Sequence, residues 1–372
     1  MAQRTQPPFR ADHVGSLLRP RTLLDARAAA ADGSLDAAEL RAVEDAAIRD
    51  VVALQESIGL QSATDGEFRR TSWHMDFIYQ LQGVRRTDEQ LAVHFRNAAG
   101  DLDFSSAALI VDAPVGLDHV IFGEAFEFLK STVTTATPKL TIPSPSMVHY
   151  RGGPAAIDRG VYPEEDEFWS DLSAAYAQEV EQLAALGCTY LQLDDTSLAY
   201  LNDPAQRAEL AEKGADAEHQ HERYIRQINA ALANRPADLH VTTHLCRGNY
   251  RSSWAAEGGY DFVAEALFGE LDVDGFFLEY DDERSGGFEP LRFVPPGKQV
   301  VLGLVTTKRP QLESKDDLKR RIDEAAKFVP LEQLCLSGQC GFSSTVEGND
   351  LTLDEEIAKL RLIVETAAEV WG

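Results

Sequence analysis

Two cysteines, a histidine and a glutamate stand at the ends of stretches that predict β-strands. His244 and Cys246 are two residues apart, so in an extended strand both side chains face the same side and can hold one metal ion. Glu279 and Cys340 end two later stretches of the same kind. Two thiolates, an imidazole and a carboxylate suit Zn²⁺ better than Mg²⁺ or Ca²⁺. These residues therefore predict a zinc site; the alternative is that the cysteines are core thiols and His244 a hydrogen-bonded core histidine.

Further polar residues occupy the corresponding ends of other predicted strands: Asp12, His13 and Ser16; Asp65 and Glu67; Asp194 and Asp195; Asp281 and Asp282; and Lys308. Asp194 is placed to reach a shared site, while Asp195 caps or orients the following helix; simple capping by both is the alternative. Glu67 either binds a substrate or pairs with Arg69 or Arg70.

For four aromatic or imidazole side chains, the sequence gives weaker evidence of a functional role. His219 and His221 lie among acidic and amide residues of a long polar helix, which indicates a solvated face. Trp73 and His74 follow the second predicted strand, where they either line a pocket or pack within a loop.

Alternating strand and helix patterns must position these residues. The predicted strands are residues 9–17, 60–68, 129–145, 189–195, 239–246, 274–281, 299–307 and 334–340. The predicted helices are 37–58, one that Pro163 and the acidic run 164–167 open, 204–234, 261–271, 314–328 and 353–370. This alternation favours a (β/α)₈ TIM barrel, whose active site lies at the C-terminal ends of its strands. A doubly wound open sheet is the alternative, but no G-x-G-x-x-G follows the first strand.

Residues 88–128 break the alternation. They contain short β-like pieces at 91–95 and 107–113, which predict a β-rich insertion between the second and third strands. No internal repeat or low-complexity linker divides the chain, so we expect a single domain over residues 1–372.

Composition limits the partners. The chain has 372 residues and a formal charge of −26, from 35 basic and 61 acidic side chains. Such a surface repels phosphate backbones and anionic membranes, so we expect no nucleic-acid or membrane partner. No apolar run approaches the roughly 18 residues of a membrane span, and the N-terminal segment lacks the apolar core of a signal peptide, which favours the cytoplasm. The four cysteines are not a disulfide framework, and Cys188 and Cys335 are expected to pack in the core.

Seven segments resemble, in the same order, the catalytic domain of cobalamin-independent methionine synthase. They are HVGSLLRP (13–20), DGEFRR (65–70), LQLDD (191–195), THLCRGN (243–249), FFLEYDD (276–282), GLVTTK (303–308) and SGQCGF (337–342). The resemblance implies four zinc ligands: His244, Cys246, Glu279 and Cys340. It also implies three residues that hold homocysteine, with the two carboxylates binding its ammonium: Ser16, Glu67 and Asp194.

The implied reaction is methyl transfer to homocysteine, giving methionine, because zinc lowers the pKa of a bound thiol and presents it as a thiolate. Lys308 and Asp194 are the predicted catalytic residues. Lys308 stands where folate-dependent members carry a histidine thought to assist protonation of the leaving amine. The N-terminal half of the two-barrel enzyme, which helps hold the folate, is absent. The methyl donor is therefore 5-methyltetrahydrofolate, a corrinoid protein or a related donor.

Two other functions remain open. One is a zinc thiol alkyltransferase that resembles epoxyalkane:coenzyme M transferase, for which a sulfonate would need Arg or Lys near the thiol. Glu67 and Asp194 favour an amino acid as the thiol substrate, while Arg19 and Arg247 leave a sulfonate-bearing thiol as the alternative. The other is a non-catalytic zinc- or thiol-binding protein, against which the combined ligand and carboxylate set argues.

Overall fold

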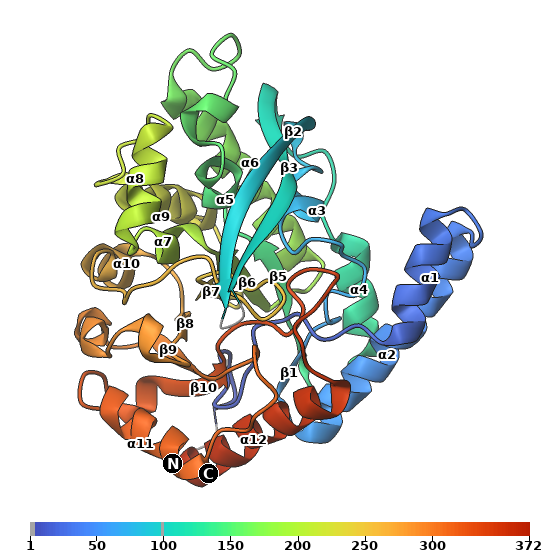
Figure 1. The fold of residues 1–372 in the computed structure, drawn as a ribbon, viewed down its shortest axis with the longest axis vertical. Coiled ribbons are helices and arrows are strands. Elements are labelled where there is room, and N and C mark those ends of the chain that lie inside the picture. Colours follow the sequence, from blue (N-terminus) through green and yellow to red (C-terminus); the bar gives the residue numbers. More distant parts are fainter. Residues whose placement is uncertain (1–3, 98–99) are drawn as a thin grey trace.

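Six parallel strands form the central sheet of the computed structural model, which describes residues 4–97 and 100–372. They lie in the order β10-β9-β8-β7-β6-β5 (Figure 1). Their bounds are β5 (Leu140–Pro143), β6 (Tyr190–Asp195), β7 (His240–Leu245), β8 (Gly275–Glu279), β9 (Gln299–Val305) and β10 (Leu334–Gly338). Nearly every residue in these strands is buried, which is typical of parallel sheets with both faces covered.

The first two predicted strands are much shorter than the other six. Ala11 makes an isolated parallel bridge to Leu336 of β10. β1 (Ser62–Ala63) pairs in parallel with β4 (Thr137–Pro138), which directly precedes β5. Ala11 thus borders β10, whereas β1 and β4 form a separate two-stranded sheet, and no ladder among the described residues joins Ala11 to β1.

Helices follow the strands and cover the sheet. They are α1 (Arg21–Ala31), α2 (Ala37–Ile58), α3 (Met75–Ile78), α4 (Gly123–Thr132), α5 (Ser146–Tyr150), α6 (Glu165–Ala185), α7 (Ser197–Tyr200), α8 (Pro204–Glu212), α9 (Gln220–Leu232), α10 (Ala264–Glu270), α11 (Lys315–Ala325) and α12 (Leu353–Trp371). Four 3₁₀ turns are η1 (Gly153–Ala156), η2 (Glu283–Ser285), η3 (Glu289–Phe293) and η4 (Leu331–Gln333). In Figure 1, α8 to α12 succeed one another around the outside of the strands. Among the described residues, no helix combines the length and hydropathy needed to cross a bilayer.

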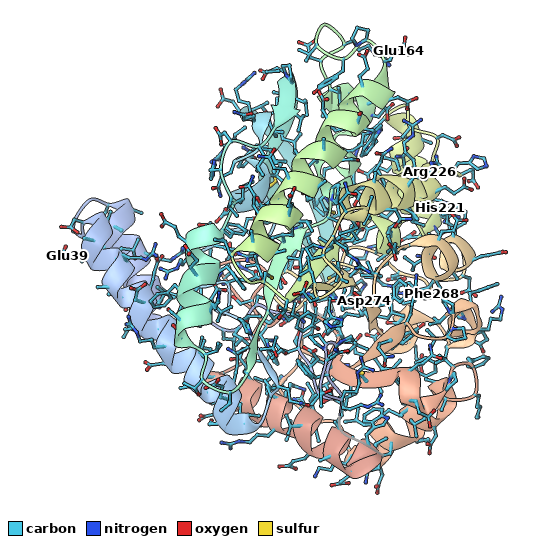
Figure 2. All side chains as sticks on the ribbon, turned by 180° about the vertical axis from the view of Figure 1, so that it is seen from behind. Glu39, Glu164, His221, Arg226, Phe268 and Asp274 are labelled. Atoms are coloured by element: carbon cyan, nitrogen blue, oxygen red, sulfur yellow. The ribbon has the colours of Figure 1, made fainter. Side chains whose placement is uncertain are left out.

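Capping residues explain where α2 begins and ends. The Asp36 carboxylate accepts hydrogen bonds from the amides of Ala38 and Glu39, and the Glu39 carboxylate accepts one from the Asp36 amide in return. Gly59 ends the helix in the left-handed region, at φ 97°. The predicted helix 37–58 is therefore confirmed. Figure 2 places Glu39 at the outer end of the α1–α2 pair, which projects from the rest of the molecule.

Two predictions about helices were wrong. The single helix predicted over 204–234 is two helices, because the chain turns at Gly214, which has a φ of 89°. His221 is not solvated: it is the second residue of α9, with 8% of its surface exposed, and its ring centroid lies 5.1 Å from that of Phe262. Figure 2 labels His221 and Arg226, which both belong to α9, in the rear view. His219, one position before the helix, is exposed as predicted.

The predicted insertion begins and ends earlier in the chain than expected, and it is more regular. β2 (Gln82–Asn97) and β3 (Gly100–Gly116) form a long antiparallel hairpin rather than short pieces, and residues 123–132 belong to α4. The hairpin crosses in front of the parallel strands in Figure 1. Its distal end is fixed to the loop after β7, because Arg96 and Trp254 exchange two backbone hydrogen bonds of 2.7 and 2.9 Å. The hairpin therefore reaches the end of the sheet where the polar residues gather.

Candidate metal centre and its pocket

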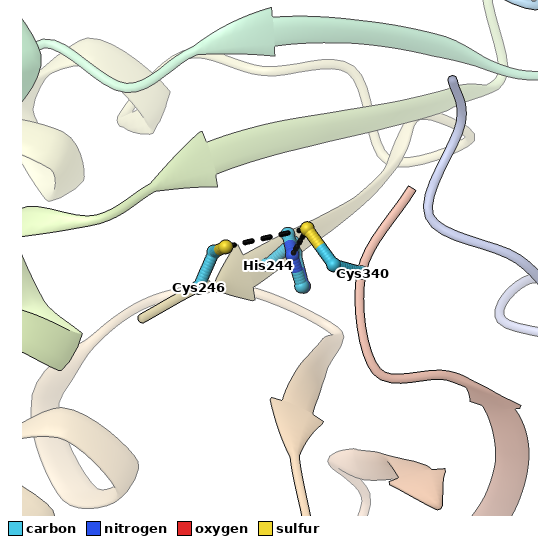
Figure 3. A group of neighbouring side chains, drawn as sticks. All are labelled: His244, Cys246 and Cys340. Carbon is cyan, nitrogen blue, oxygen red and sulfur yellow. Dashed lines mark hydrogen bonds between the residues drawn. The ribbon is translucent and has the colours of Figure 1, made fainter. Parts of the chain in front are cut away.

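Three predicted ligands lie together at the C-terminal ends of β7 and β10. The Cys246 and Cys340 sulfurs are 3.2 Å apart, and His244 Nε2 is 3.4 Å from Cys340 Sγ (Figure 3). Their ligand atoms all lie within 4.8 Å of one another, and all three residues are buried. Tetrahedral zinc with these ligands separates the donor atoms by roughly 3.3–3.8 Å. The donor set therefore fits a zinc ion with small adjustments.

The surroundings favour a thiolate at Cys340, whereas the hydrogen bond to Cys340 and burial raise the pKa of Cys246 well above its usual value. The Gly248 amide donates to Cys246 Sγ at 3.3 Å. The hydrogen bond from Cys246 and the neighbouring His244 imidazole outweigh burial and lower the pKa of Cys340 well below its usual value. A thiolate, not a thiol, is the form that binds a metal.

Glu279, the fourth predicted ligand, is fully buried at the end of β8 but outside this group of three. Its Oε2 accepts from the Arg247 amide at 2.9 Å, and its Oε1 accepts from Arg284 at 3.1 Å and Lys308 at 3.3 Å. Burial alone would raise the pKa of Glu279, but the charges of Lys308 and Arg284 hold it at about 2. Glu279 is thus a permanent carboxylate whose oxygens are held by donors.

Lys308 is buried beside Glu279 and is not among the residues that line the cavity described below. Burial would lower the pKa of Lys308, but Glu279 and Asp281 raise it instead. The ammonium is therefore firmly charged and directed at the carboxylate, and the role of Lys308 as a proton donor stays a prediction.

One cavity contains the three soft ligands together with Ser16, Glu67 and Asp194. Ser16 Oγ accepts from the Ser343 amide at 3.3 Å. The backbone of Gly341 approaches Ser16 so closely that an added Cβ would lie 2.0 Å from its Oγ. The three residues that the resemblance assigned to homocysteine thus border the same space as the candidate metal centre.

Glu67 and Asp194 form a pair of buried carboxylates in this cavity. Glu67 adopts a left-handed backbone at φ 60°, and its Oε1 accepts from Thr141 at 2.9 Å while Oε2 has no partner among the described residues. Arg70 forms an ion pair with Glu67 at 3.7 Å, as one of the two alternatives expected, whereas Arg69 contacts Glu44 and Asp45.

Burial raises the pKa of Glu67 and raises that of Asp194 to about 7. The charge of Glu67 adds to burial in raising the pKa of Asp194, because two like charges disfavour each other's ionised form. A bound cation would relieve both carboxylates. The pair is therefore chemically suited to an ammonium group.

Asp195 also lines the cavity, but four hydrogen bonds from neighbouring loops and from α7 engage its carboxylate. Its Oδ1 accepts from the Ser197 hydroxyl and the Leu198 amide at 2.8 Å, and its Oδ2 accepts from the hydroxyls of Ser144 and Ser146. Capping and orientation by Asp195 are thus confirmed. Cys188 and Cys335 are likewise buried in the core, as predicted.

Arg19 and Arg247 are occupied by structural contacts. Arg19 donates to backbone oxygens of Glu67 and Arg70 at 2.8 and 2.9 Å. Arg247 donates to the backbone oxygens of Gly258 and Glu279 and to the Tyr260 hydroxyl, at 2.8–3.1 Å. Neither lines the cavity, so neither supplies the cation that a sulfonate would need there.

Several cavity residues escaped the sequence analysis. Trp73 and His74 line the cavity, which settles their two alternatives in favour of a pocket. The missed residues come mainly from the hairpin and from loops: Met75, Val93, Phe95, Phe104, Leu109, Met147, Arg151, Tyr200 and Tyr250. The available signal was the two-residue spacing of Val93 and Phe95, which puts both on one face of β2.

Comparisons with known proteins agree with this geometry. The family model of the cobalamin-independent synthase catalytic domain matches residues 10–369. The uncharacterized protein YxjH of Bacillus subtilis is 46% identical, over 98% of this chain and 95% of its own. The putative vitamin-B12 independent methionine synthase of Listeria monocytogenes is 37% identical, with a TM-score of 0.78 over 99% of this chain and all of that one. A B12-independent methionine synthase from Shewanella sp. W3-18-1, in complex with selenomethionine, shares the fold at 20% identity, with a TM-score of 0.72 over 97% of both chains. The chain therefore belongs to the cobalamin-independent methionine synthase family, as a single copy of its catalytic domain.

Proposed function

We propose that this protein is a zinc-dependent S-methyltransferase that methylates homocysteine to methionine, with 5-methyltetrahydrofolate or a related compound as donor. The observation that carries the proposal is the single cavity shared by two buried carboxylates and three soft metal ligands. We further propose that residues 1–372 form one (β/α)₈ domain, with the β2–β3 hairpin as its insertion.

His244, Cys246 and Cys340 would hold the metal, and Glu279 is proposed as the fourth ligand. Bound zinc would keep a substrate thiol ionised near neutral pH. Ligation by Glu279 Oε1 would compete with the hydrogen bonds that this oxygen accepts from Lys308 and Arg284. Lys308 is accordingly proposed to act through Glu279, by keeping it charged and oriented.

Glu67 and Asp194 are proposed to bind the ammonium of homocysteine, and Ser16 to contact its backbone. The ammonium would add a cation beside two buried carboxylates, of which Glu67 pairs with Arg70 at 3.7 Å but has no partner for Oε2 among the described residues. This contact fixes the amino acid so that its sulfur faces the soft ligands, which lowers the entropic cost of reaction.

The reaction then transfers a methyl group between two heteroatoms. The substrate sulfur donates an electron pair to the methyl carbon while the bond from that carbon to the donor's heteroatom breaks. The electron pair of the broken bond stays on the donor's heteroatom, which takes up a proton. Asp194 is proposed as a catalytic residue because it holds the nucleophilic substrate.

Thiol selectivity tests the proposal. The zinc-loaded protein is titrated with homocysteine, cysteine and coenzyme M, and the preferred thiol is then supplied with 5-methyltetrahydrofolate. We expect homocysteine to bind best and to be converted to methionine. Preferential binding of coenzyme M would instead support the alkyltransferase alternative, and thiol binding without turnover of any donor would support a binding protein.

A further inference from the structure

The two cysteines of the candidate metal centre lie on loops and not on the sheet itself. Cys246 is the first residue after β7, and Cys340 is the second residue after β10. Strands β8 and β9 separate β7 from β10, so no ladder among the described residues joins the two segments. Figure 3 shows the two sulfurs approaching each other from these different segments. Their separation of 3.2 Å therefore depends on contacts between the loops.

Asn249 joins the two loops directly. It follows Cys246 by three residues, and its Nδ2 donates to the Gly341 carbonyl oxygen at 2.7 Å and to the Ser344 hydroxyl at 3.1 Å. Gly341 is the residue next to Cys340. A side-chain amide from the first loop thus holds the backbone of the second loop immediately beside its thiol.

Asn349 holds Asn249 in this orientation and adds the loop after β9. Its Nδ2 donates to Asn249 Oδ1 at 2.9 Å and to the Thr307 carbonyl oxygen at 2.8 Å, while its Oδ1 accepts from the Ser252 amide at 3.0 Å. Because a carbonyl oxygen only accepts and a backbone amide only donates, these partners determine which way round each side-chain amide lies. Both asparagines are 7% exposed, so water competes little for their hydrogen bonds.

Thr307 binds both chain neighbours of Cys340. Its hydroxyl lies 3.0 Å from the Gly341 carbonyl oxygen and 3.0 Å from Gln339 Oε1, and its amide donates to Gln339 Oε1 at 2.6 Å. The residues before and after Cys340 are therefore both bound to the same network between loops.

The contacts of Asn249 assign it to the protein, although it also borders the cavity. Both hydrogens of its amide are donated, to Gly341 and to Ser344, and its oxygen accepts from Asn349. An asparagine amide has two hydrogens to donate, so none is left for a substrate. Asn349 is not among the residues that line the cavity.

We propose that Asn249 and Asn349 form an amide pair that positions the Cys246 and Cys340 sulfurs for a metal ion, and so determines how tightly the centre binds zinc. This inference rests on the proposed function, of which the metal centre is a part. Both asparagines are positioning residues, because their hydrogen bonds go to the loops and to each other. Groups that orient metal ligands without binding the metal typically change metal affinity by about 10- to 100-fold.

Zinc competition against a chromophoric chelator tests this assignment on the full chain. The proteins are wild type, Asn249→Ala, Asn349→Ala and the double variant. Each single variant should bind zinc about tenfold more weakly or worse, because the two sulfurs lose their fixed separation. The double variant should lose little more than the more affected single variant, since either substitution breaks the same connection.

The matched control is Asn229→Ala. The Asn229 amide joins α9 to the C-terminal end of α10, through hydrogen bonds with the backbone of Glu270 and Asp272 at 2.8 and 2.7 Å, far along the chain from the predicted ligands. This variant loses a comparable pair of hydrogen bonds and should bind zinc as wild type does. The cobalt-loaded proteins give a second measurement, because the absorption of cobalt(II) reports its thiolate ligands and their geometry. Their spectrum should change in the Asn249 and Asn349 variants and not in the control.

Thermal unfolding of the metal-free chains shows which variants fold. Thr307→Val removes one hydroxyl, keeps the branched shape, and carries the test if the alanine variants do not fold; it should weaken zinc binding about two- to tenfold, the effect of one neutral hydrogen bond. The inference is overturned if the folded variants bind zinc as wild type does, if their cobalt spectra are unchanged, if the double variant shows additive losses, or if Asn229→Ala loses as much affinity. Failure of wild type to bind zinc would instead overturn the proposed metal centre itself.

Discussion

Replacing Glu67 with glutamine should weaken substrate binding and strengthen the fold at the same time. The glutamine amide oxygen can still accept the hydrogen bond from Thr141, so the local geometry is retained. What disappears is a buried negative charge whose Oε2 has no partner among the described residues. The substitution therefore isolates the charge from the shape of the side chain.

The two effects have opposite signs. An ammonium that loses one of its two carboxylates should bind more weakly by about 1–3 kcal/mol, a factor of roughly 5 to 150. Burial raises the pKa of Glu67 above that of the unfolded chain, so the folded state holds the proton more strongly. Ionisation of this carboxyl thus costs stability as pH rises from the unfolded value toward the folded one, and Glu67→Gln should raise the Tm of the ligand-free protein in that range.

The assay combines calorimetric titration with thermal unfolding. Homocysteine is compared with 4-mercaptobutanoate, which has the same thiol and carboxylate but lacks the ammonium, and which should bind wild type and Glu67→Gln equally. Glu356→Gln is the matched control, because Glu356 is also buried with a raised pKa but does not line this cavity. Equal homocysteine affinity in wild type and Glu67→Gln would refute the ammonium contact, and so would a parallel loss with 4-mercaptobutanoate.

Three further perturbations follow from particular contacts. Burial raises the pKa of Glu356 to about 8, so its ionisation removes stability as pH rises from about 4.5 to 8. Glu356→Gln should therefore stabilise the protein at pH 7 by on the order of 3 kcal/mol and have little effect near pH 4.5. Urea unfolding at several pH values measures this gain, and a gain that does not change with pH would contradict the burial of a titrating carboxyl. Lys308→Met leaves Glu279 without one of its two cationic donors and should cost about 3–5 kcal/mol of unfolding free energy; an unchanged urea midpoint would contradict the ion pair. Gly341→Ala forces a Cβ to within 2.0 Å of Ser16 Oγ and should raise the KM for homocysteine, whereas Gly269→Ala, where a Cβ meets nothing within 4 Å, should leave that KM unchanged.

The sequence predicted those parts of the site that are specified by local spacing on strands. His244 and Cys246 lie on one face because they are two residues apart, and parallel strands bring their C-terminal ends together, which places Cys340 beside them. Glu67 needed the structure, because only the three-dimensional packing reveals that Arg70 remains at 3.7 Å and that Oε2 has no partner.

The hairpin and the arginines could not be derived in this way. The sequence carries no local signal for the length of the pairing between β2 and β3 or for the isolated bridge that joins the hairpin to the loop at Trp254. Arg19, Arg151 and Arg247 look equivalent in sequence, yet backbone oxygens engage the first and third while only Arg151 lines the cavity. Likewise, the sequence placed Lys308 at the end of the correct strand, but only side-chain packing determines that its ammonium points toward Glu279.

Metal content is the most direct test of the central claim. Protein purified without chelator should contain about one zinc per chain by elemental analysis. Cys246→Ser and Cys340→Ser should lose that zinc while remaining folded, whereas Cys188→Ser and Cys335→Ser, which alter buried thiols outside the candidate metal centre, should retain it. Absence of zinc from wild type after metal supplementation, or full zinc retention by Cys246→Ser and Cys340→Ser, would contradict the account.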